Sequence, residues 1–386
     1  MSKAKVAWLA EGFVGRKASG TARVAREIAL SLNSFHAEEI QTILLTKKLQ
    51  TKIELDKDPK FQGAEVIKLP KVRSKVLASS LQFYFSRFNK KIRQLEINYL
   101  IFSVPRFYPF FWIFPSANFI CIFHAGGDIT VKPDKFIFSR HAYNLIAKLQ
   151  WRRLREIIAV SEIAAKEISL NYKIPRDKIR VILPGADHLW ELQQEEYGAK
   201  FSGSKKPFIF VVGRWQRFKN IQNIVEGLLD ATSILLTHNI LILAGSQYLM
   251  NEKTKKIISK YPENSIACVE YVSDSQLKFL YNSAELVVHP SLNEGFGLPA
   301  FEAFGEGAKI LVHSSTPAAH YLNAFPNVTV DDLSTVENIP DSVSRALKTV
   351  KIDPKVGKDL IRNLGATWSQ NTNSYAKLFN NNQEEN

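Results

Sequence analysis

Short, almost entirely apolar runs alternate along the chain with segments in which apolar residues recur at helical spacing. An apolar run of this kind is typical of a strand covered on both faces, and alternating strands and helices predict doubly wound parallel sheets. The chain is therefore predicted to have an α/β fold, and no internal repeat is evident. The runs predicted to be strands are Val6 to Ala10, Thr42 to Leu45, Leu100 to Ser103, Phe119 to Phe123, Ile157 to Val160, Phe208 to Val212, Ile240 to Ala244, Ile266 to Val269, Leu286 to His289 and Lys309 to His313.

The length of 386 residues exceeds the usual size of one hydrophobic core and predicts two domains. The best candidate for a linker is the largely polar stretch from Leu183 to Gly203, so we place the domain boundary near residue 195. Ligands of doubly wound sheets bind beyond the carboxyl ends of the strands. Two facing sheets would therefore enclose a binding cleft between the domains.

Charge and cysteine content limit the partners and the compartment. Lys and Arg outnumber Asp and Glu by 51 to 37, and the net charge of +14 predicts an anionic partner, whether a phosphorylated substrate, a membrane surface or nucleic acid. With only Cys121 and Cys268 present, we expect no disulfide framework and no zinc site, which fits a reducing, cytoplasmic location. The apolar run at the start of the chain stops at Glu11, too early for a signal peptide.

The most hydrophobic stretch, Tyr99 to Phe123, is long enough to span a bilayer. It also contains Arg106 and three prolines, which argue against a spanning helix. We interpret it as two buried strands joined by a loop.

The most informative string runs from His289 to Gly307, directly after a predicted strand. Gly295 and Gly297 allow a positive φ and a close approach of the backbone to a ligand. Pro299 suits the first turn of a helix, and Gly307 suits its end. A loop that leads into a helix in this way exposes backbone N–H groups to an anion or a sugar hydroxyl.

Two carboxylates stand in the same string. Glu294 lies in the predicted loop and Glu302 about one turn inside the predicted helix, so both could face one ligand. An ionised carboxylate only accepts hydrogen bonds and therefore suits the vicinal hydroxyls of a sugar. The alternative is an ordinary strand–glycine–helix turn with two surface glutamates.

A second constellation follows the predicted strand that ends at Val212. Gly213, Arg214 and Lys219 provide a close backbone and fixed positive charge, as a diphosphate requires, and Arg214 adds a guanidinium fork. Helical spacing of apolar residues begins at Ile221. The alternative is a solvated basic turn.

Both strings resemble motifs of one known family. Residues 294 to 302 resemble the Glu-x7-Glu signature of the retaining GT-B glycosyltransferases, family 4-like or group 1. The resemblance implies two Rossmann-like doubly wound domains that face each other across a cleft. It implies that Glu294 contacts hydroxyls of the donor sugar and that Glu302 binds the ribose. The residues whose amides would meet the sugar and phosphate are Gly295, Phe296, Gly297 and Leu298.

The Gly-Arg…Lys-Asn string resembles the diphosphate-binding motif of the same family. The resemblance implies that Gly213 binds the donor and that Arg214 and Lys219 neutralise the departing nucleoside diphosphate. Arg217 is not required by the motif. We also place Val272 among the predicted donor-binding residues.

Two features of the first half extend the resemblance. Residues 11 to 23 resemble the family's glycine-rich loop, which borders the phosphates and acceptor. Gly20 and Thr21 replace the usual paired glycines of that loop. The alternative is a simple strand-to-helix connection. A helix is predicted from about Thr21 to Leu32. His124 closes a predicted strand, and the resemblance implies that it approaches the donor sugar and phosphate, whereas an isolated histidine is more often structural.

The resemblance also assigns the domains. Residues 1–195 would form the acceptor domain and residues 196–364 the donor domain. The end of the chain, residues 365–386, resembles a helix that crosses back to the first domain, followed by a disordered tail.

The family transfers a hexose from a nucleoside-diphosphate sugar to a glycan or lipid-linked acceptor, with retention and without an obvious enzyme nucleophile. The resemblance therefore implies a catalytic set of Arg214, Lys219, Glu294 and His124, with no cofactor and no metal. No Asp-x-Asp motif follows a suitable strand, and Asp331 and Asp332 are predicted to lie in a late surface loop.

Residues 68 to 93 carry basic side chains and no acidic one, around an apolar stripe at helical spacing. A basic amphipathic helix predicts peripheral docking on an anionic membrane, from which a lipid-linked acceptor could be reached. The alternative is a domain helix that packs its stripe inward. The basic residues are Lys68, Lys71, Arg73, Lys75, Arg87, Lys90, Lys91 and Arg93.

Other classes of function are less well supported. A nucleic-acid-binding protein would fit the net charge, but the chain lacks a recognisable nucleic-acid motif, so no nucleic-acid partner is predicted. A sugar-nucleotide epimerase or a non-catalytic relative would share the fold, and only product analysis separates these from a transferase.

Overall fold

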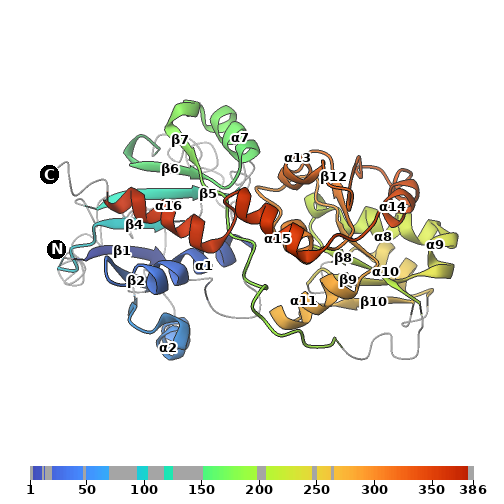
Figure 1. The fold of residues 1–386 in the computed structure, drawn as a ribbon, viewed down its shortest axis with the longest axis horizontal. Coiled ribbons are helices and arrows are strands. Elements are labelled where there is room, and N and C mark those ends of the chain that lie inside the picture. Colours follow the sequence, from blue (N-terminus) through green and yellow to red (C-terminus); the bar gives the residue numbers. More distant parts are fainter. Residues whose placement is uncertain are drawn as a thin grey trace. The chain divides into compact units, whose positions relative to one another are not determined.

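The computed structural model describes residues 3–10, 13, 20–46, 49–68, 94–102, 117–124, 151–197, 206–245, 250–261 and 265–380. Contacts within the chain divide it into two compact units (Figure 1). The first unit is Met1–Pro184 together with Trp368–Asn386, and the second is Gly185–Thr367.

The first unit is built on a parallel sheet in which, among the described residues, seven strands have the order β3-β2-β1-β4-β5-β6-β7. The strands β2, β1, β4 and β5 are almost wholly buried, as expected of strands covered on both faces. The strands are β1 Ala4–Leu9, β2 Ile40–Thr46, β3 Glu65–Lys68, β4 Tyr99–Phe102, β5 Asn118–Phe123, β6 Glu156–Ala159 and β7 Ile179–Val181.

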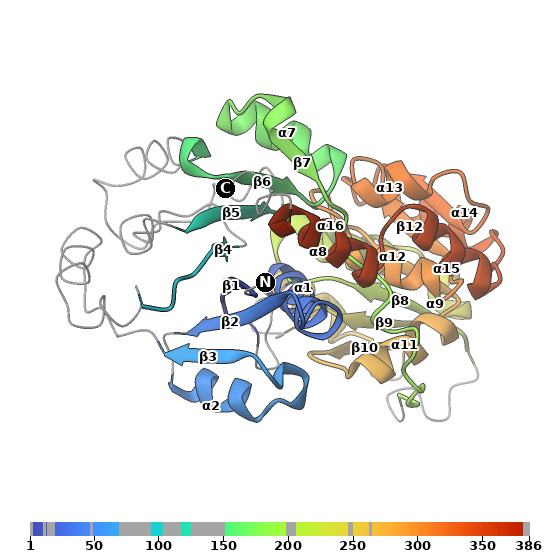
Figure 2. The ribbon, with the colours of Figure 1, turned by 60° about the vertical axis from the view of Figure 1, so that its left-hand side comes forward.

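Helices that surround this sheet include the last helix of the chain, which lies beside α1 (Figures 1 and 2). The hydroxyl of Tyr99 donates to the carbonyl of Phe379 at 3.2 Å, and His36 Nε2 lies 3.1 Å from Asn373 Oδ1. The helices are α1 Gly20–Phe35, α2 Leu49–Lys57, α7 Glu162–Tyr172 and α16 Trp368–Asn380, with 3-10 turns at Pro59–Phe61, Trp151–Arg153 and Arg176–Lys178.

The second unit holds a parallel sheet with the strand order β10-β9-β8-β11-β12-β13 among the described residues. The chain runs outward from β8 to β10 and then returns to the other side of β8 with β11, so the order reverses between β8 and β11. The strands are β8 Phe208–Val212, β9 Asn239–Leu243, β10 Ile266–Val269, β11 Leu286–His289, β12 Ile310–His313 and β13 Val328–Asp331.

Helices connect these strands, and apolar side chains of α8 and α14 pack with those of β8 and β11 in one core. The helices are α8 Ile221–Asp230, α9 Thr232–Thr237, α10 Glu252–Ile258, α11 Asp274–Ser283, α12 Leu298–Gly305, α13 Pro317–Leu322, α14 Ile339–Leu347 and α15 Pro354–Asn363.

The predicted α/β fold is confirmed, and each predicted strand corresponds to an observed one. The bounds of β8, β10 and β11 match the prediction. Three observed strands were not predicted: β3, β7 and β13. All three are edge strands with partly exposed residues, so they lack the continuous apolar character that marks a strand covered on both faces. For the same reason the placement of Asp331 in a loop was wrong, because this residue ends β13.

The units meet at Pro184, earlier than the predicted boundary near residue 195. The reason is that residues after Gly185 are tied to the second unit. Lys278 Nζ donates to the carbonyls of Trp190 at 2.7 Å and Leu192 at 3.0 Å. The polar composition of residues 185–197 therefore does not mark a free linker.

The hydrophobic stretch from residue 99 to 123 contributes β4 and β5, and residues 103–116 between them lie outside the described part. No helix within the described residues has the length and apolar character needed to cross a membrane. Residues 69–93 of the basic segment and residues 14–19 of the glycine-rich loop also lie outside it, so the predictions for these segments stay predictions.

Candidate functional site

The candidate site of the second unit lies where the strand order reverses, at the carboxyl ends of β8 and β11. Parallel α/β sheets bind ligands at this position, because the loops after the two strands leave in opposite directions. The loop after β8 carries residues 213–220, and the loop after β11 carries residues 290–297. Both strings singled out in the sequence are thereby neighbours.

The loop after β8 starts at a glycine that packs against the next helix. A Cβ at Gly213 would lie 2.7 Å from Cδ1 of Ile221, the first residue of α8, so any other residue here would require the Ile221 side chain to shift. The N–H of Gly213 donates a hydrogen bond to the carbonyl of Leu243 at 3.0 Å. Arg214 follows and is exposed.

A 3-10 turn, Arg217–Lys219, then leads to Asn220 and α8. Asn220 is buried and has a left-handed backbone with φ of 57°. Asparagine adopts this conformation more readily than most residues, which explains its place between turn and helix. The turn presents Lys219 toward the neighbouring loop while Arg217 remains exposed.

The loop after β11 begins at His289, the buried last residue of the strand. Glu294 is the point at which several side chains of the site converge. Its Oε1 atom forms an ion pair with Lys219 Nζ, accepts a hydrogen bond from Ser291 Oγ at 2.9 Å, and lies 3.3 Å from His289 Nε2. The two loops are thus joined by a charged side-chain contact.

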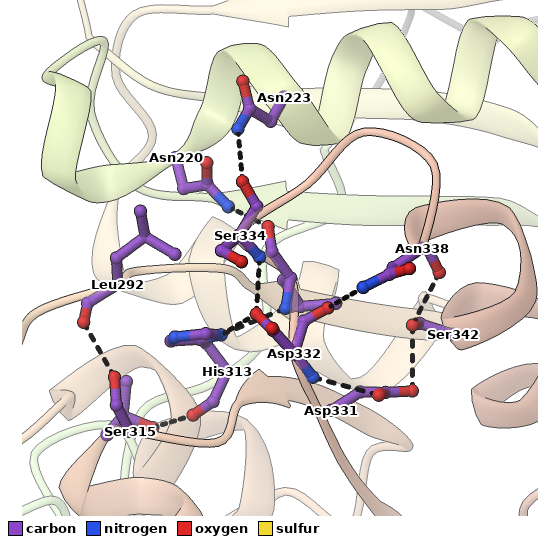
Figure 3. Close-up of polar contacts among 12 residues, drawn as sticks. Asn220, Asn223, Leu292, His313, Ser315, Asp331, Asp332, Ser334, Asn338 and Ser342 are labelled. Atoms are coloured by element: carbon purple, nitrogen blue, oxygen red, sulfur yellow. Dashed lines mark hydrogen bonds and ion pairs between the residues drawn. The ribbon is translucent and has the colours of Figure 1, made fainter.

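Backbone contacts join the same loops. The N–H of Leu292 donates to the carbonyl of Phe218 at 2.8 Å. The carbonyl of Leu292 in turn accepts from Ser315 Oγ, also at 2.8 Å (Figure 3). Lys219 and Glu294 are therefore held by fixed backbone as well as by their own ion pair.

The environment of Glu294 keeps its carboxylate ionised. Burial alone would raise the pKa of Glu294, but the positive charge of Lys219 and the contact with His289 outweigh burial and lower the pKa to about 2. The side chain of Glu294 is 15% exposed, so it is accessible to a small polar ligand. A charged acceptor at this point suits hydroxyl donors.

This shift predicts a pH dependence of stability. The pKa of Glu294 falls from 4.5 to about 2 on folding, so its stabilising contribution is present above pH 4.5 and is lost as the pH falls toward 2. The full contribution is on the order of 3 kcal/mol. Chemical denaturation at several pH values checks this prediction. The loss in the free energy of unfolding caused by Glu294→Gln should be greatest near pH 6. The difference in this free energy between the variant and the wild type should shrink toward pH 3. A constant difference would contradict the assigned pKa.

The segment after Glu294 forms the predicted loop-to-helix junction. Gly297 has φ of 94° and precedes α12, and Pro299 lies in the first turn, so these two predictions are confirmed. Gly295, for which a positive φ was also expected, does not adopt one. Phe296 stacks on Phe301 with ring centroids 4.1 Å apart, which fixes the loop against the helix. Because Gly297 has no side chain, it does not cap the amides of the first turn.

Glu302 lies one turn inside α12, as predicted, but it is only 3% exposed. The hydroxyl of Tyr281 donates to its Oε2 at 2.9 Å, and His188 Nε2 lies 3.3 Å from its Oε1. The carboxylate is therefore enclosed by two polar partners from other elements. Binding of a ribose by Glu302 stays a prediction.

The remaining predicted residues lie away from these loops along the chain. Val272 is buried and precedes Ser273, the N-cap of α11. Gly20 is the exposed first residue of α1, and His124 follows β5, both in the first unit. Burial lowers the pKa of His124 to about 3, so its imidazole is neutral at physiological pH.

Sequence reasoning missed three residues that shape the site: His289, Ser291 and Asn220. His289 and Ser291 stood in the string after β11 but were not given a role. The spacing of Ser291, three residues before Glu294, was a usable signal for a local hydrogen bond. Within the described residues, no group of three or more His, Cys, Asp or Glu side chains is placed to hold a metal ion.

Comparison with known families matches both halves of the chain. Residues 18–188 match the family described as Glycosyltransferase Family 4. Residues 193–364 match the family described as Glycosyl transferases group 1. The second match contains both loops of the candidate site.

Individual relatives are more distant. The O-antigen chain mannosyltransferase RfbU of Salmonella typhimurium is 25% identical over 222 residues, which span 55% of this chain and 59% of that protein. A glycosyltransferase from Rickettsia africae has a similar structure, with a TM-score of 0.72, 17% identity and 98% of each chain covered. Anabaena HepE, solved with UDP and glucose, has a TM-score of 0.65 and 14% identity, covering 98% of this chain and 100% of that one. These structural likenesses concern the fold.

Proposed function

Because this chain belongs to the group 1 and family 4 glycosyltransferases with the two-domain GT-B fold, we propose that it transfers a hexose from a nucleoside-diphosphate sugar to a hydroxyl group, with retention of anomeric configuration. The acceptor we propose is a growing glycan or a lipid-linked saccharide. The observation that carries the proposal is the contact between Lys219 and Glu294 across the point where the strand order reverses. It brings a cation suited to phosphate beside a carboxylate suited to sugar hydroxyls.

In this proposal the donor diphosphate lies at the carboxyl end of β8. Gly213 permits close approach of the backbone, and Arg214 and Lys219 supply positive charge where negative charge develops as the glycosidic bond to phosphate breaks. Glu294 accepts hydrogen bonds from sugar hydroxyls, which orients the ring beside the cations. Charge that is already in place stabilises the departing diphosphate without the cost of reorganising solvent.

A hexose and a nucleotide-sugar donor are supported by named relatives. The Salmonella relative is a mannosyltransferase of the O-antigen chain, and the Anabaena protein was solved with UDP and glucose. Retention rests on the resemblance of residues 294–302 to the Glu-x7-Glu signature.

We propose a supporting role for His124 in the first unit. A neutral imidazole offers one N–H as a hydrogen-bond donor and adds no charge, which suits contact with a sugar hydroxyl or a phosphate oxygen. His124→Ala should then weaken turnover, and His124→Asn should retain part of it through its side-chain amide.

The test is a thermal-shift and turnover screen of the full chain against UDP-, GDP- and ADP-sugars, with and without EDTA. We expect one nucleotide class to stabilise the protein and slow release of its diphosphate to persist in EDTA, since the cations of the site replace a metal. Loss of all activity in EDTA would contradict the metal-independent mechanism.

Product analysis by NMR then distinguishes transfer with retention from inversion, and transfer from epimerisation of the donor. Absence of binding and turnover with every donor would overturn the proposal.

A further inference from the structure

The residue after Lys219 is held in an unusual way. Asn220 is 4% exposed, has a left-handed backbone, and donates from Nδ2 to the carbonyl of Leu333 at 2.6 Å (Figure 3). Leu333 lies in the loop that follows β13, far along the chain from Asn220. A buried amide hydrogen bond of this kind costs stability when one partner is removed, because the other partner is left unsatisfied.

The Leu333 peptide is fixed from the opposite side as well. Its N–H donates at 3.0 Å to Nδ1 of His313, the last residue of β12. Burial lowers the pKa of His313, so the ring is neutral and Nδ1 can accept. The backbone of Leu333 thus connects the start of α8 with the end of β12.

The loop that carries Leu333 is itself rigidly held. Asp332 Oδ1 accepts from the N–H of Ser334 at 2.9 Å, and Asn338 Nδ2 donates to the carbonyl of Asp332 at 3.3 Å. Asp331 accepts from Ser342 Oγ at 2.9 Å and is paired with Arg345. Figure 3 shows Asp331, Asp332, Ser334, Asn338 and Ser342 joined by hydrogen bonds, with His313 beside Asp332. The loop can therefore serve as a fixed anchor.

We propose that His313 and Asn220, joined through the peptide of Leu333, are positioning residues that aim Lys219 at the donor diphosphate. The inference rests on the proposed function, because it assigns a purpose to the orientation of Lys219. Lys219 has a long side chain with many rotamers, so a fixed backbone reduces the ordering cost of binding. Neither positioning residue needs to touch the donor.

The test separates the side-chain hydrogen bond from the backbone conformation. Asn220→Gly keeps the left-handed backbone but removes the amide, whereas Asn220→Ala removes the amide and strains the backbone. Asn223→Ala is the matched control, because Asn223 donates at 3.1 Å to Ser334 of the same loop from a partly exposed position on α8. UDP, GDP and ADP are titrated separately into each variant, and turnover is measured with the donor sugar of the class that binds.

We expect Asn220→Gly to weaken binding of the nucleoside diphosphate and to lower kcat/KM by about 10-fold, a change of the size expected when one buried hydrogen bond is lost. Asn223→Ala should change both by less than about twofold. In a Lys219→Ala background, Asn220→Gly should add little, because residues that act through one another are not additive. Equal effects of Asn220→Gly with and without Lys219 would show a general structural role and overturn the inference.

A second set of variants replaces His313. His313→Leu removes the acceptor for the Leu333 N–H and should reproduce the effect of Asn220→Gly. His313→Asn places an acceptor near the position of Nδ1 and should restore part of the lost binding and turnover. If the wild type binds no nucleotide, the proposed function fails. If the wild type binds and Lys219→Ala weakens binding while Asn220→Gly and His313→Leu leave it unchanged, only this inference fails.

Discussion

Replacing Lys219 with alanine is expected to lower kcat/KM by about 100- to 1,000-fold, the loss typical of removing one preorganised group that stabilises developing charge. Lys219 forms an ion pair with Glu294 at the point where the strand order reverses between β8 and β11. Its removal should act mainly on kcat, because charge on the departing diphosphate is greatest in the transition state. Steady-state kinetics with the donor identified by the screen measures the change.

The control for this variant is Arg217→Ala. Arg217 belongs to the same 3-10 turn and carries the same charge, but it is exposed. We expect its removal to change kcat/KM by less than about fivefold, mostly through the general electrostatic field. Similar losses in the two variants would mean that net charge, and not the placement of Lys219, supports turnover.

Lys219→Ala also leaves Glu294 as a partly buried carboxylate without its cation, which lowers stability. Glu294→Gln in the same chain removes that uncompensated charge. The double variant should therefore recover thermal stability and remain inactive. This separates the loss of turnover from a loss of folded protein, and recovery of turnover in the double variant would contradict the assigned role of Lys219.

The sequence predicted the site where the backbone requires particular residue types. Gly297 and Pro299 were identified because a positive φ and a first helical turn restrict the choice of residue, and the structure has both. Central strands such as β8 and β11 were predicted for a similar reason, since burial on both faces demands a continuous apolar run.

The contacts that hold the site were not predictable in this way. Asn220 and Leu333 are separated by 113 residues in the chain, and Lys219 and Glu294 by 75 residues. Which loops meet depends on the strand order, and the apolar runs specify strands without specifying their neighbours. The strand order also includes edge strands such as β13, whose residues after Val328 are all partly exposed, so the sequence there lacks the continuous apolar run of a central strand.

Glu302 illustrates the same limit at one residue. Its position one turn inside a helix followed from its distance to Pro299, but its enclosure by Tyr281 and His188 did not. Those partners come from α11 and from the segment just after Pro184. Local spacing therefore predicted where the carboxylate lies along the helix, and tertiary packing decided how much of it remains accessible.

The end of α12 provides the largest expected effect on stability. Gly307 has φ of 76°, and a Cβ at this position would lie 2.3 Å from the carbonyl oxygen of Ile352 and 3.2 Å from the backbone nitrogen of Pro354. Gly307→Ala therefore combines an unfavourable left-handed backbone with a clash against backbone atoms, which cannot turn aside as a side chain can. We expect a loss of about 3 kcal/mol or more in the free energy of unfolding.

Gly365→Ala is the matched control, because Gly365 has nearly the same φ, 74°, with no atom within 4 Å of an added Cβ. Both glycines belong to the second unit, so chemical denaturation reports on the same part of the molecule for both. Gly365→Ala should cost about 1 kcal/mol, the backbone contribution alone, and the difference between the variants measures the clash. Equal losses would mean that the segment from Ile352 to Pro354 moves aside at little cost. A clear excess for Gly307→Ala would show instead that this segment is firmly packed on the end of α12, the helix whose first turn follows Glu294.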